Sequence, residues 1–465
     1  MDTFVIEGGR RLFGRVRVNG SKNAALPLLA ATLLTDDVIT LRDVPDLADI
    51  RSMVGLLAEL GMTRQDETPK GGVYTLKTTD PSACHARYEI VRTMRASIST
   101  LGPLVAKRGH ARISLPGGCA IGERPVDLHL RGLRALGATI TLNGGDIVAE
   151  APAGGLVGAT VFLGGAFGST VLGTANVMCA AALARGTTII ESAACEPEIV
   201  DLATMLIAMG AKIRGHGSPR IIIDGVEELR GTDYSVMADR IEAGTLMMAA
   251  AITNGDLTLD NCPLDALLAT TYFLDMAGVH VQPLANLAQS RQKVPALSVT
   301  SATSDPSRGD DPQRRSVRVT CDRVLRPVEV TTQPHPGFPT DLQAQLMALL
   351  CLADGNSIIT ERIFPDRFLH VAELSRMGAN LMRTGSTVVI SGVRQLKGAP
   401  VMASDLRASA GLVLAGMAAE GTTIVNRVYH LDRGYERLED RLRSLGASIQ
   451  RVDEKTLAPS ELVSG

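Results

Sequence analysis

The chain of 465 residues contains no tryptophan, and aromatic side chains make up only 3% of it. A core must therefore be built from the aliphatic residues and methionine that dominate the 45% hydrophobic content. The 47 basic and 49 acidic residues nearly cancel, so the sequence lacks the broad basic field that nucleic-acid binding uses. We expect no nucleic-acid partner, and any anionic ligand would have to be held by a local cluster of cations.

Long apolar runs and metal-binding patterns are also absent. The longest apolar segment, residues 24–34, is too short to span a bilayer, and the N-terminus lacks the features of a secretory signal, so we expect a cytoplasmic protein without membrane insertion. The seven cysteines form no CxxC pair and the eight histidines no ligand spacing, which favours reduced thiols and no metal. A P-loop and a strand followed by GxGxxG are both missing, so no dinucleotide cofactor is predicted.

A short phrase returns six times along the chain, namely a leucine-rich helix end that closes in Gly or Ala-Gly. Its glycines are Gly61, Gly137, Gly210, Gly278, Gly378 and Gly446. They are spaced 68 to 76 residues apart, except for one interval of 100 residues. The repeat unit is therefore roughly 70 residues long, with one insertion in the fourth copy.

Each unit is expected to begin with an Ala-rich helix, followed by a β-rich run and a second helix. The first helices are predicted at 23–34, 93–106, 170–184, 240–253, 341–353 and 405–419. Six βαβ-like units predict an α/β protein made of two three-unit halves, with the seam near residues 227–235. The segment 288–318 is rich in Ser, Asp, Arg and Pro and cannot bury a core, so we expect a flexible surface insertion there.

One stretch, the loop predicted at residues 113–124, carries the most specific chemistry. The Pro-Gly-Gly sequence before Cys119 excludes a regular helix or an interior strand, so this thiol is expected on a mobile loop. Arg124 follows, and Pro125 is expected to open a helix at its first position. A thiol beside a cation at a helix start suits a reactive cysteine near an anion, whereas an inert small core residue is the alternative interpretation.

Cations recur in or just before the first turns of predicted helices, where they oppose the helix dipole. They are Lys22, Arg95, Arg124, Arg367, Arg407 and Arg433. This repeated placement indicates an anion bound at helix N-termini, although each cation alone could equally be an exposed surface charge. Asp341 and Asp405 begin two of the helices, and capping is the commonest use of Asp there.

Other charged groups are expected to be structural. Asp46, Asp49, the Glu196-Pro197-Glu198 run and the 437–441 run are interpreted as solvated helix starts and faces. His129 and His370 are predicted to be hydrogen-bonding groups rather than metal ligands, and Cys179 is predicted to lie in the core.

Seven motifs together carry a resemblance to a known family. They are Gly20-Ser21-Lys22-Asn23-Ala24-Ala25-Leu26-Pro27, Thr93-Met94-Arg95-Ala96-Ser97, Leu115-Pro116-Gly117-Gly118-Cys119, Arg124-Pro125-Val126-Asp127-Leu128-His129, Phe338-Pro339-Thr340-Asp341, Asp405-Leu406-Arg407-Ala408-Ser409-Ala410 and His430-Leu431-Asp432-Arg433-Gly434-Tyr435-Glu436. In this order, over nearly the whole chain, the sequence resembles the UDP-N-acetylglucosamine enolpyruvyl transferases. The resemblance implies a two-domain inside-out α/β barrel with three βαβαββ units per domain. The N-terminal domain would span 22–232, and 1–21 would return to the C-terminal domain of 233–465.

The reaction that the resemblance implies needs no cofactor. The 3-hydroxyl of UDP-N-acetylglucosamine adds to C2 of phosphoenolpyruvate, phosphate then leaves, and the product is committed to peptidoglycan. Cys119 matches the proton donor to C3, Asp341 the base and Asp405 a carboxylate near the reacting centre. Lys22, Arg124 and Arg433 match cations at the phosphate and carboxylate of phosphoenolpyruvate. The residues implied to bind the two substrates are Lys22, Asn23, Arg95, Arg124, Pro125, Val126, Asp127, Leu128, Asp341, Ile363, Arg367 and Arg407. No protein partner is implied.

Two departures and two alternatives accompany this resemblance. The string Gly168–Thr174 replaces the family's usual diphosphate-binding Ser-Val-Gly-Ala-Thr, and the 288–318 insertion has no counterpart. The alternatives are a 3-phosphoshikimate 1-carboxyvinyltransferase of the same fold and a non-catalytic UDP-sugar-binding paralogue. Cys119 and the Arg-Pro-Val-Asp-Leu-His string favour the UDP-sugar enzyme over the first. Retention of Lys22, Cys119 and Asp341 argues against the second.

Overall fold

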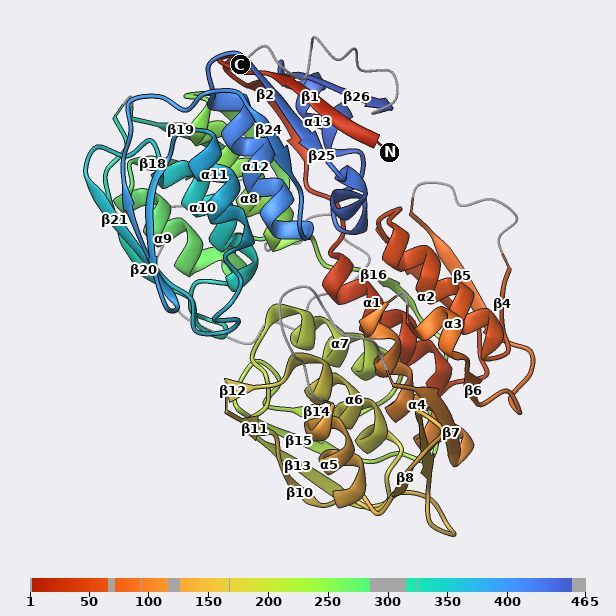
Figure 1. The fold of residues 1–465 in the computed structure, drawn as a ribbon. Coiled ribbons are helices and arrows are strands. Elements are labelled where there is room, and N and C mark those ends of the chain that lie inside the picture. The colour runs from red at the N-terminus through yellow and green to blue at the C-terminus, as the bar shows by residue number, and fades with distance from the viewer. Residues whose placement is uncertain are drawn as a thin grey trace, which may run out of the picture.

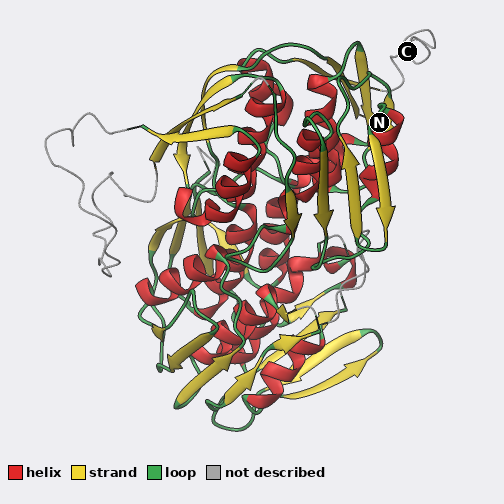
Figure 2. Ribbon diagram, turned by 90° about the vertical axis from the view of Figure 1, so that its left-hand side faces the viewer, coloured by secondary structure: helices red, strands yellow, loops and turns green. Residues whose placement is uncertain are grey.

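The computed structural model describes residues 2–65, 72–92, 94–115, 126–166, 168–284, 315–322 and 324–453. Over these residues the chain forms two lobes, each built of helices inside and strands around them (Figures 1 and 2). Each lobe has a separate hydrophobic core, one drawn from residues 24–236 and the other from residues 4–18 together with 238–449. No helix in the described part of the chain is long and apolar enough to cross a membrane.

Among the described residues, six four-stranded sheets share one topology, in which an edge strand runs parallel to its neighbour and the other two pairings are antiparallel. In the first lobe the sheets are β16 (Asp233–Ser235), β3 (Ile39–Arg42), β5 (Tyr74–Thr78), β4 (Met62–Arg64); β6 (His85–Ala86), β7 (His110–Ser114), β9 (Asp146–Glu150), β8 (Thr139–Asn143); and β10 (Thr160–Phe162), β13 (Thr187–Glu191), β15 (Arg220–Asp224), β14 (Lys212–Arg214). In the second lobe they are β2 (Phe13–Arg17), β17 (Asp256–Cys262), β19 (Arg315–Cys321), β18 (Val279–Pro283); β20 (Glu329–Thr331), β21 (Asn356–Thr360), β23 (Thr387–Ser391), β22 (Asn380–Thr384); and β24 (Pro400–Met402), β25 (Thr422–Asn426), β1 (Asp2–Glu7), β26 (Ser448–Asp453). The repeated topology confirms the six units predicted from the glycine spacing.

The first helix of each unit is buried on nearly all sides, as its Ala and Leu composition demands. These helices are α1 (Lys22–Ala31), α4 (Leu101–Arg108), α6 (Val171–Ala182), α8 (Arg240–Ile252), α10 (Gln343–Leu350) and α12 (Leu406–Ala418). The second helices are α2 (Ala48–Glu59), α5 (Asp127–Ala135), α7 (Pro197–Ala208), α9 (Leu268–Met276), α11 (Leu369–Arg376) and α13 (Leu438–Ser444). Shorter turns are α3 (Tyr88–Val91), η1 (Thr32–Leu34), η2 (Arg95–Thr100), η3 (Leu264–Leu267), η4 (Thr340–Leu342) and η5 (Val428–Arg433), and β11 (Gly164–Gly165) pairs with β12 (Gly168–Ser169).

The predicted first helix of the second unit is divided. The helix expected over 93–106 begins as the 3-10 helix η2 and becomes α-helical only at Leu101. The hydroxyls of Ser97 and Thr100 donate to the carbonyls of Met94 and Ser97, at 2.5 and 2.8 Å, which holds the tighter turn. Apolar periodicity alone does not reveal these hydroxyl–carbonyl hydrogen bonds, so it predicted a continuous α-helix.

The N-terminal strands complete sheets at the far end of the chain. β1 lies between β25 and β26, so the red N-terminal strand runs beside the blue C-terminal strands in Figure 1. β2 pairs with β17, while β16 pairs with β3, so the strands that precede α1 and α8 are exchanged between the lobes. Residues 1–21 were predicted to return in this way. The chain crosses back to the second lobe after Ser235.

The two crossing segments run side by side between the lobes. Ser21 N donates to the Met237 carbonyl at 2.7 Å, and Asp239 N donates to the Asn19 carbonyl at 2.8 Å. A Cβ placed on Gly20 would lie 1.7 Å from the Asp43 carbonyl oxygen, so only glycine fits at this position. This crossing places the start of α1 at the boundary between the lobes.

The insertion predicted at 288–318 lies outside the described residues as far as 314. Its last four residues belong to β19, where Val317 and Val319 are buried in the core and Arg318 is exposed. The alternation of a half-buried strand therefore begins earlier than the predicted boundary, which was placed too late because the polar residues Arg315, Ser316 and Arg318 resemble loop composition.

Candidate functional site

Six of the predicted site residues meet around two carboxylates at the boundary between the lobes. They are Lys22, Asn23, Asp341, Arg367, Arg407 and Arg433. Lys22 is the first residue of α1, whose N-cap Ser21 accepts a hydrogen bond from Ala24 N at 3.3 Å. This cap fixes the start of the helix and with it the direction of the lysine stem.

Asp341 lies in η4 and gathers three partners. Its Oδ1 accepts a hydrogen bond from Arg367 Nη1 at 2.9 Å, and its Oδ2 accepts from Arg407 Nη2 at 3.3 Å and from Asn23 Nδ2 at 3.5 Å. Asn23 belongs to the first lobe, and the arginines belong to the second. Burial raises the pKa of the Asp341 carboxyl, but the charges of Arg407, Arg367 and Lys22 outweigh it and hold that pKa well below its usual range.

The turn that carries Asp341 is fixed by a fully buried carboxylate, Glu361. Its Oε1 accepts from Thr332 Oγ1 at 2.7 Å and from Ile363 N at 2.8 Å, and its Oε2 accepts from Thr340 Oγ1 at 2.9 Å. The predicted contact Ile363 is thereby tied through its backbone to the turn of Asp341. Glu361 was not predicted, because a single carboxylate after a strand belongs to no recognisable motif.

Asp405 occupies the N-cap of α12. Its Oδ1 accepts from Arg407 N at 2.8 Å and from Ala408 N at 3.1 Å, which is the capping arrangement expected for Asp before an Ala-rich helix. The cap also fixes the first turn from which Arg407 reaches Asp341. Behind Arg407, its guanidinium carbon lies 5.5 Å from the centre of the Tyr435 ring, and the Tyr435 hydroxyl lies 3.0 Å from Gln345 Nε2.

Lys22 and Arg433 both contact a residue that was predicted to be solvated. Asp49 in the first turn of α2 is 5% exposed and places Oδ2 at 3.2 Å from Lys22 Nζ and Oδ1 at 3.0 Å from Arg433 Nε. The prediction of a solvated helix start was therefore wrong. Asp49 precedes Met53 and Leu56 at i+4 and i+7, both buried, so it continues the apolar face of α2, and this signal was present in the sequence.

Three other charged groups expected to be solvated are buried. Glu198 is 3% exposed and accepts from Arg240 Nε at 2.9 Å, and Glu196 accepts from the backbone of His335 at 3.4 Å. Glu439 is 7% exposed and accepts from Arg451 Nε at 2.6 Å. These predictions were wrong because each carboxylate is buried against a donor in the fold. The donor is the Arg240 guanidinium for Glu198, the backbone N–H of His335 for Glu196 and the Arg451 guanidinium for Glu439.

The remaining predicted site residues fall in two groups. Cys119, Arg124 and Pro125 lie outside the described residues, and so does the helix start predicted at Pro125. Arg95 opens η2, whereas Val126–Leu128 enter α5 and in the described part of the chain form no hydrogen bond or ion pair with Asp341.

Near Arg95, His129 is buried and hydrogen-bonded to Asn176 Nδ2 through its ring Nδ1 at 2.8 Å, as predicted for a hydrogen-bonding group. Burial, with a contribution from Arg95, lowers the pKa of His129 to about 4. Cys179 is buried in α6, which confirms its prediction as a core residue.

The string that replaces the family's diphosphate-binding loop belongs to the first lobe and approaches the second. Gly168 and Ser169 form β12, and Thr170 caps α6 by accepting from Gly173 N at 3.2 Å. A Cβ on Gly168 would lie 3.4 Å from Pro334 of the second lobe. The string therefore faces the segment that leads to Asp341.

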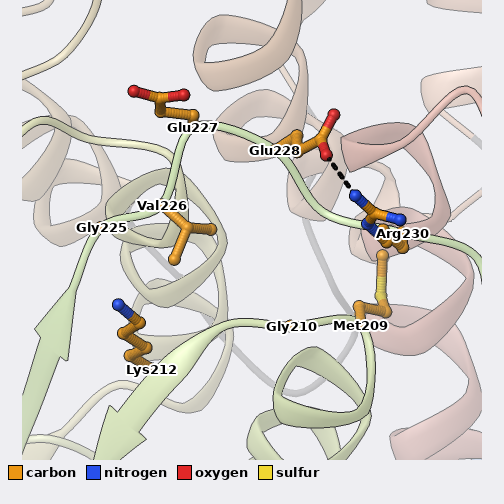
Figure 3. Close-up of a pocket in the computed structure, with 8 residues that line it drawn as sticks. All are labelled: Met209, Gly210, Lys212, Gly225, Val226, Glu227, Glu228 and Arg230. Atoms are coloured by element: carbon orange, nitrogen blue, oxygen red, sulfur yellow. Dashed lines mark hydrogen bonds and ion pairs between the residues drawn. The ribbon is translucent and has the colours of Figure 1, made fainter.

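A separate depression of about 450 Å³ lies at the ends of β14 and β15 (Figure 3). Its lining residues are Met209, Gly210, Lys212, Gly225, Val226, Glu227, Glu228 and Arg230. Glu228 and Arg230 pair with each other at 2.9 Å. None of the predicted site residues lines this depression. In the described part of the chain, no group of three or more His, Cys, Asp or Glu side chains is arranged to hold a metal ion.

Comparison with known proteins identifies the family. The family model for EPSP synthase (3-phosphoshikimate 1-carboxyvinyltransferase) matches residues 6–442. The chain belongs to the enolpyruvyl transferase family. It is 51% identical to a UDP-N-acetylglucosamine 1-carboxyvinyltransferase of Anaeromyxobacter sp. (strain Fw109-5), with 97% of this chain and 99% of the relative covered. It is 49% identical to the protein of that name from Magnetococcus marinus, with 97% and 100% covered.

Solved structures of this family share the fold. The enolpyruvyl transferase NikO from Streptomyces tendae superposes with a TM-score of 0.81 at 23% identity, covering 97% of this chain and 99% of NikO. EPSP synthase from Acinetobacter baumannii superposes with a TM-score of 0.71 at 17% identity, covering 97% and 100%. These likenesses confirm the predicted enolpyruvyl transferase architecture of two lobes with helices inside.

Proposed function

We propose that this enolpyruvyl transferase moves the enolpyruvyl group of phosphoenolpyruvate to the 3-hydroxyl of UDP-N-acetylglucosamine and releases phosphate, as the first committed step of peptidoglycan synthesis. The relatives of that name, at about half identity over nearly the full chain, support this acceptor. The observation that carries the chemistry is the meeting of Lys22, Asp341 and Arg433 at the boundary between the lobes.

The reaction is an addition followed by an elimination. The sugar oxygen bonds to C2 of phosphoenolpyruvate while C3 gains a proton, and the tetrahedral intermediate then loses phosphate from C2 and a proton from C3. Cys119 is proposed as the acid that protonates C3, and Asp341 as the base that accepts the hydroxyl proton. A positioned acid or base contributes about 10²–10⁴ in rate.

The environment of Asp341 suits a base that becomes stronger when the substrates bind. Arg407 and Arg367 keep its carboxylate ionised in the unliganded site, at the cost of a low proton affinity. An anionic substrate that engages these arginines would compete for their charge and raise the pKa of Asp341. Proton transfer would then be favoured only when the substrate is in place.

Lys22, Arg124 and Arg433 are proposed to hold the phosphate and carboxylate of phosphoenolpyruvate, with Asn23 beside them. In the described part of the chain Arg433 is bound only through Nε, so its two terminal nitrogens remain available for a planar anion. The substrate-binding set extends to Arg95, Val126, Asp127, Leu128, Ile363, Arg367 and Arg407, and Asp405 is proposed to act near the reacting centre.

We further propose that the two lobes are the two domains predicted from the sequence and that they close on the substrates to exclude water. The cytoplasm is the proposed compartment, because the six cysteines of the described residues are all free thiols, as a reducing compartment favours. The partners are two small molecules.

The decisive experiment is phosphate release from phosphoenolpyruvate with each acceptor in turn. The proposal requires release with UDP-N-acetylglucosamine and none with shikimate 3-phosphate. Release only with shikimate 3-phosphate would instead indicate a 3-phosphoshikimate 1-carboxyvinyltransferase. Absence of release with either acceptor, despite UDP-N-acetylglucosamine binding in calorimetry, would indicate a binding protein without turnover.

A further inference from the structure

One carboxylate joins two cations that come from opposite lobes. Asp49 of α2 contacts Lys22 Nζ of α1 through Oδ2 at 3.2 Å and Arg433 Nε of η5 through Oδ1 at 3.0 Å. The side chains of Asp49 and Lys22 are 8% and 10% exposed, whereas that of Arg433 is 44% exposed. This ion pair thus joins a buried carboxylate of the first lobe to a partly exposed arginine of the second.

The position of Asp49 in its helix favours this arrangement. It lies in the first turn of α2, where the helix dipole stabilises a negative charge. The N-cap of α2 is Leu47, which gives no side-chain cap. Nearby, the backbone N–H of Asp46 donates to Glu436 Oε2 at 3.2 Å, a second contact between the same two segments. The start of α2 is therefore held against the segment after η5.

The charges leave this cluster attractive to an anion. Two cations share one carboxylate, so a single positive charge remains. Lys22 faces Asp49 from α2, Arg407 from α12 and Asp341 from η4. Burial lowers the pKa of the Lys22 ammonium, Asp49 raises it, and Arg407 lowers it. Without Asp49, the buried lysine would lose its strongest support for the charged form.

We propose that Asp49 is a positioning residue for phosphoenolpyruvate. Its carboxylate holds Lys22 in place and draws Arg433 from the opposite lobe to the same anion. This inference rests on the proposed function, in which Lys22 and Arg433 hold that substrate. On this proposal, the Asp49 side chain couples closure of the lobes to binding of the anion. Each cation is brought to the anion site by a carboxylate that does not itself touch the substrate.

The test is steady-state kinetics of the full chain with Asp49→Asn, in which the shape is kept and the charge is lost. The KM for phosphoenolpyruvate is expected to rise at least tenfold, while the KM for UDP-N-acetylglucosamine changes less than threefold. The alkaline limb of kcat/KM for phosphoenolpyruvate should also move to lower pH, because the Lys22 ammonium deprotonates more easily. A purely structural role would not move that limb.

Two further variants make the result specific. Asp49→Glu restores the charge one methylene further out, so the alkaline limb should return to its wild-type position while the KM stays raised. Asp46→Asn removes an exposed carboxylate from the same segment, and wild-type kinetics are expected. If Asp49→Asn does not fold, the Asp49→Glu variant decides the question, because an unchanged KM for phosphoenolpyruvate would refute the proposal.

Two outcomes with Asp49→Asn would overturn the inference. Unchanged kinetics would mean that Asp49 only packs the site, and a lower KM would mean that its carboxylate competes with the substrate for the cations. Both outcomes presuppose a wild-type chain that releases phosphate with UDP-N-acetylglucosamine. A wild-type chain without that activity would instead reject the proposed function, so the two failures are distinguishable.

Discussion

Arg407 Nη2 lies 3.3 Å from Asp341 Oδ2, and Arg367 Nη1 lies 2.9 Å from the other oxygen of the same carboxylate. The two arginines are 4% and 6% exposed, whereas the Asp341 side chain is 27% exposed, so the carboxylate is backed by buried cations and keeps one open side. Asp341 is thereby fixed at the boundary between the lobes. The arginines that pair with its carboxylate belong to the second lobe, and its amide partner, Asn23, belongs to the first.

We expect Asp341→Asn to lower kcat by about 10²–10⁴, the usual contribution of a positioned base, while binding of UDP-N-acetylglucosamine is largely kept. Turnover and calorimetric affinity measured on the same preparation check this. Asp366→Asn is the matched control, because Asp366 is an exposed carboxylate on the adjacent segment that pairs only with the surface Arg383 in the described structure. Full activity of Asp341→Asn would refute its role as base.

The proposed role of Cys119 predicts selective alkylation by fosfomycin, an epoxide analogue of phosphoenolpyruvate. Burial raises the pKa of Cys179 and Cys351 to about 12, and burial together with Asp265 does the same for Cys262, so these thiols are poor nucleophiles. Mass spectrometry should find one label on the wild-type chain and none on Cys119→Ser.

The control for this labelling is Cys84→Ser. Cys84 is half-buried beside Arg108 and so is more accessible than the three buried cysteines, but burial raises its pKa as well. This variant should be labelled like the wild type. Labelling that persists in Cys119→Ser and disappears in Cys84→Ser would contradict the assignment of Cys119.

Much of the fold could be predicted because it depends on periodic features. The six glycines that end the second helices and the Ala-rich first helices recur at a nearly constant spacing, and each corresponds to one sheet with the same strand order. Periodicity does not predict the exchange of β2 and β16 between the lobes. Each is a parallel edge strand of three to five residues that pairs through its backbone, and such a strand leaves little pattern in the sequence.

The site was harder to predict where its residues act through partners distant in sequence. Lys22, Asp341 and Arg433 were found because each belongs to a motif. Asp49 and Glu361 have no motif, and their importance follows from being buried beside groups 384 and 29 residues away. A carboxylate on the apolar face of a helix was the available signal for Asp49, and it was outweighed by the expectation that Asp in a first turn is solvated.

The ion pair between Arg240 and Glu198 predicts a large effect on stability. Arg240 begins α8 just after the crossing segment, and Glu198 lies in α7 of the first lobe, with the side chains 9% and 3% exposed. Glu198→Leu alone leaves a buried guanidinium without its partner, so the free energy of unfolding should fall by about 3–5 kcal/mol.

The double variant distinguishes charge from packing. Glu198→Leu with Arg240→Met replaces the buried pair by apolar groups of similar volume, and its stability in urea should exceed that of Glu198→Leu alone. If the double variant is less stable by the sum of the two single effects, the pair is not coupled in the way the 2.9 Å contact indicates.

His370 predicts how stability depends on pH. It is 1% exposed, and neither ring nitrogen has a hydrogen-bond partner in the described structure, so the prediction of a hydrogen-bonding group was wrong for this histidine. Burial lowers its pKa from 6.5 to about 4, with Asp405 raising it and Arg367 lowering it further. Between these two values the unfolded chain binds more protons than the folded chain, so stability is lost as the pH falls from about 6.5 towards 4.

We therefore expect His370→Leu to lose less stability on acidification than the wild type. The difference in the free energy of unfolding between pH 7 and pH 4.5 should shrink by about 2–3 kcal/mol, as a shift of this size implies. Because no hydrogen bond is lost, the variant should be at least as stable as the wild type at pH 7. An equal acid loss in His370→Leu and wild type would mean that His370 is not held neutral by burial, and His129, with the same lowered pKa, would become the next variant to measure.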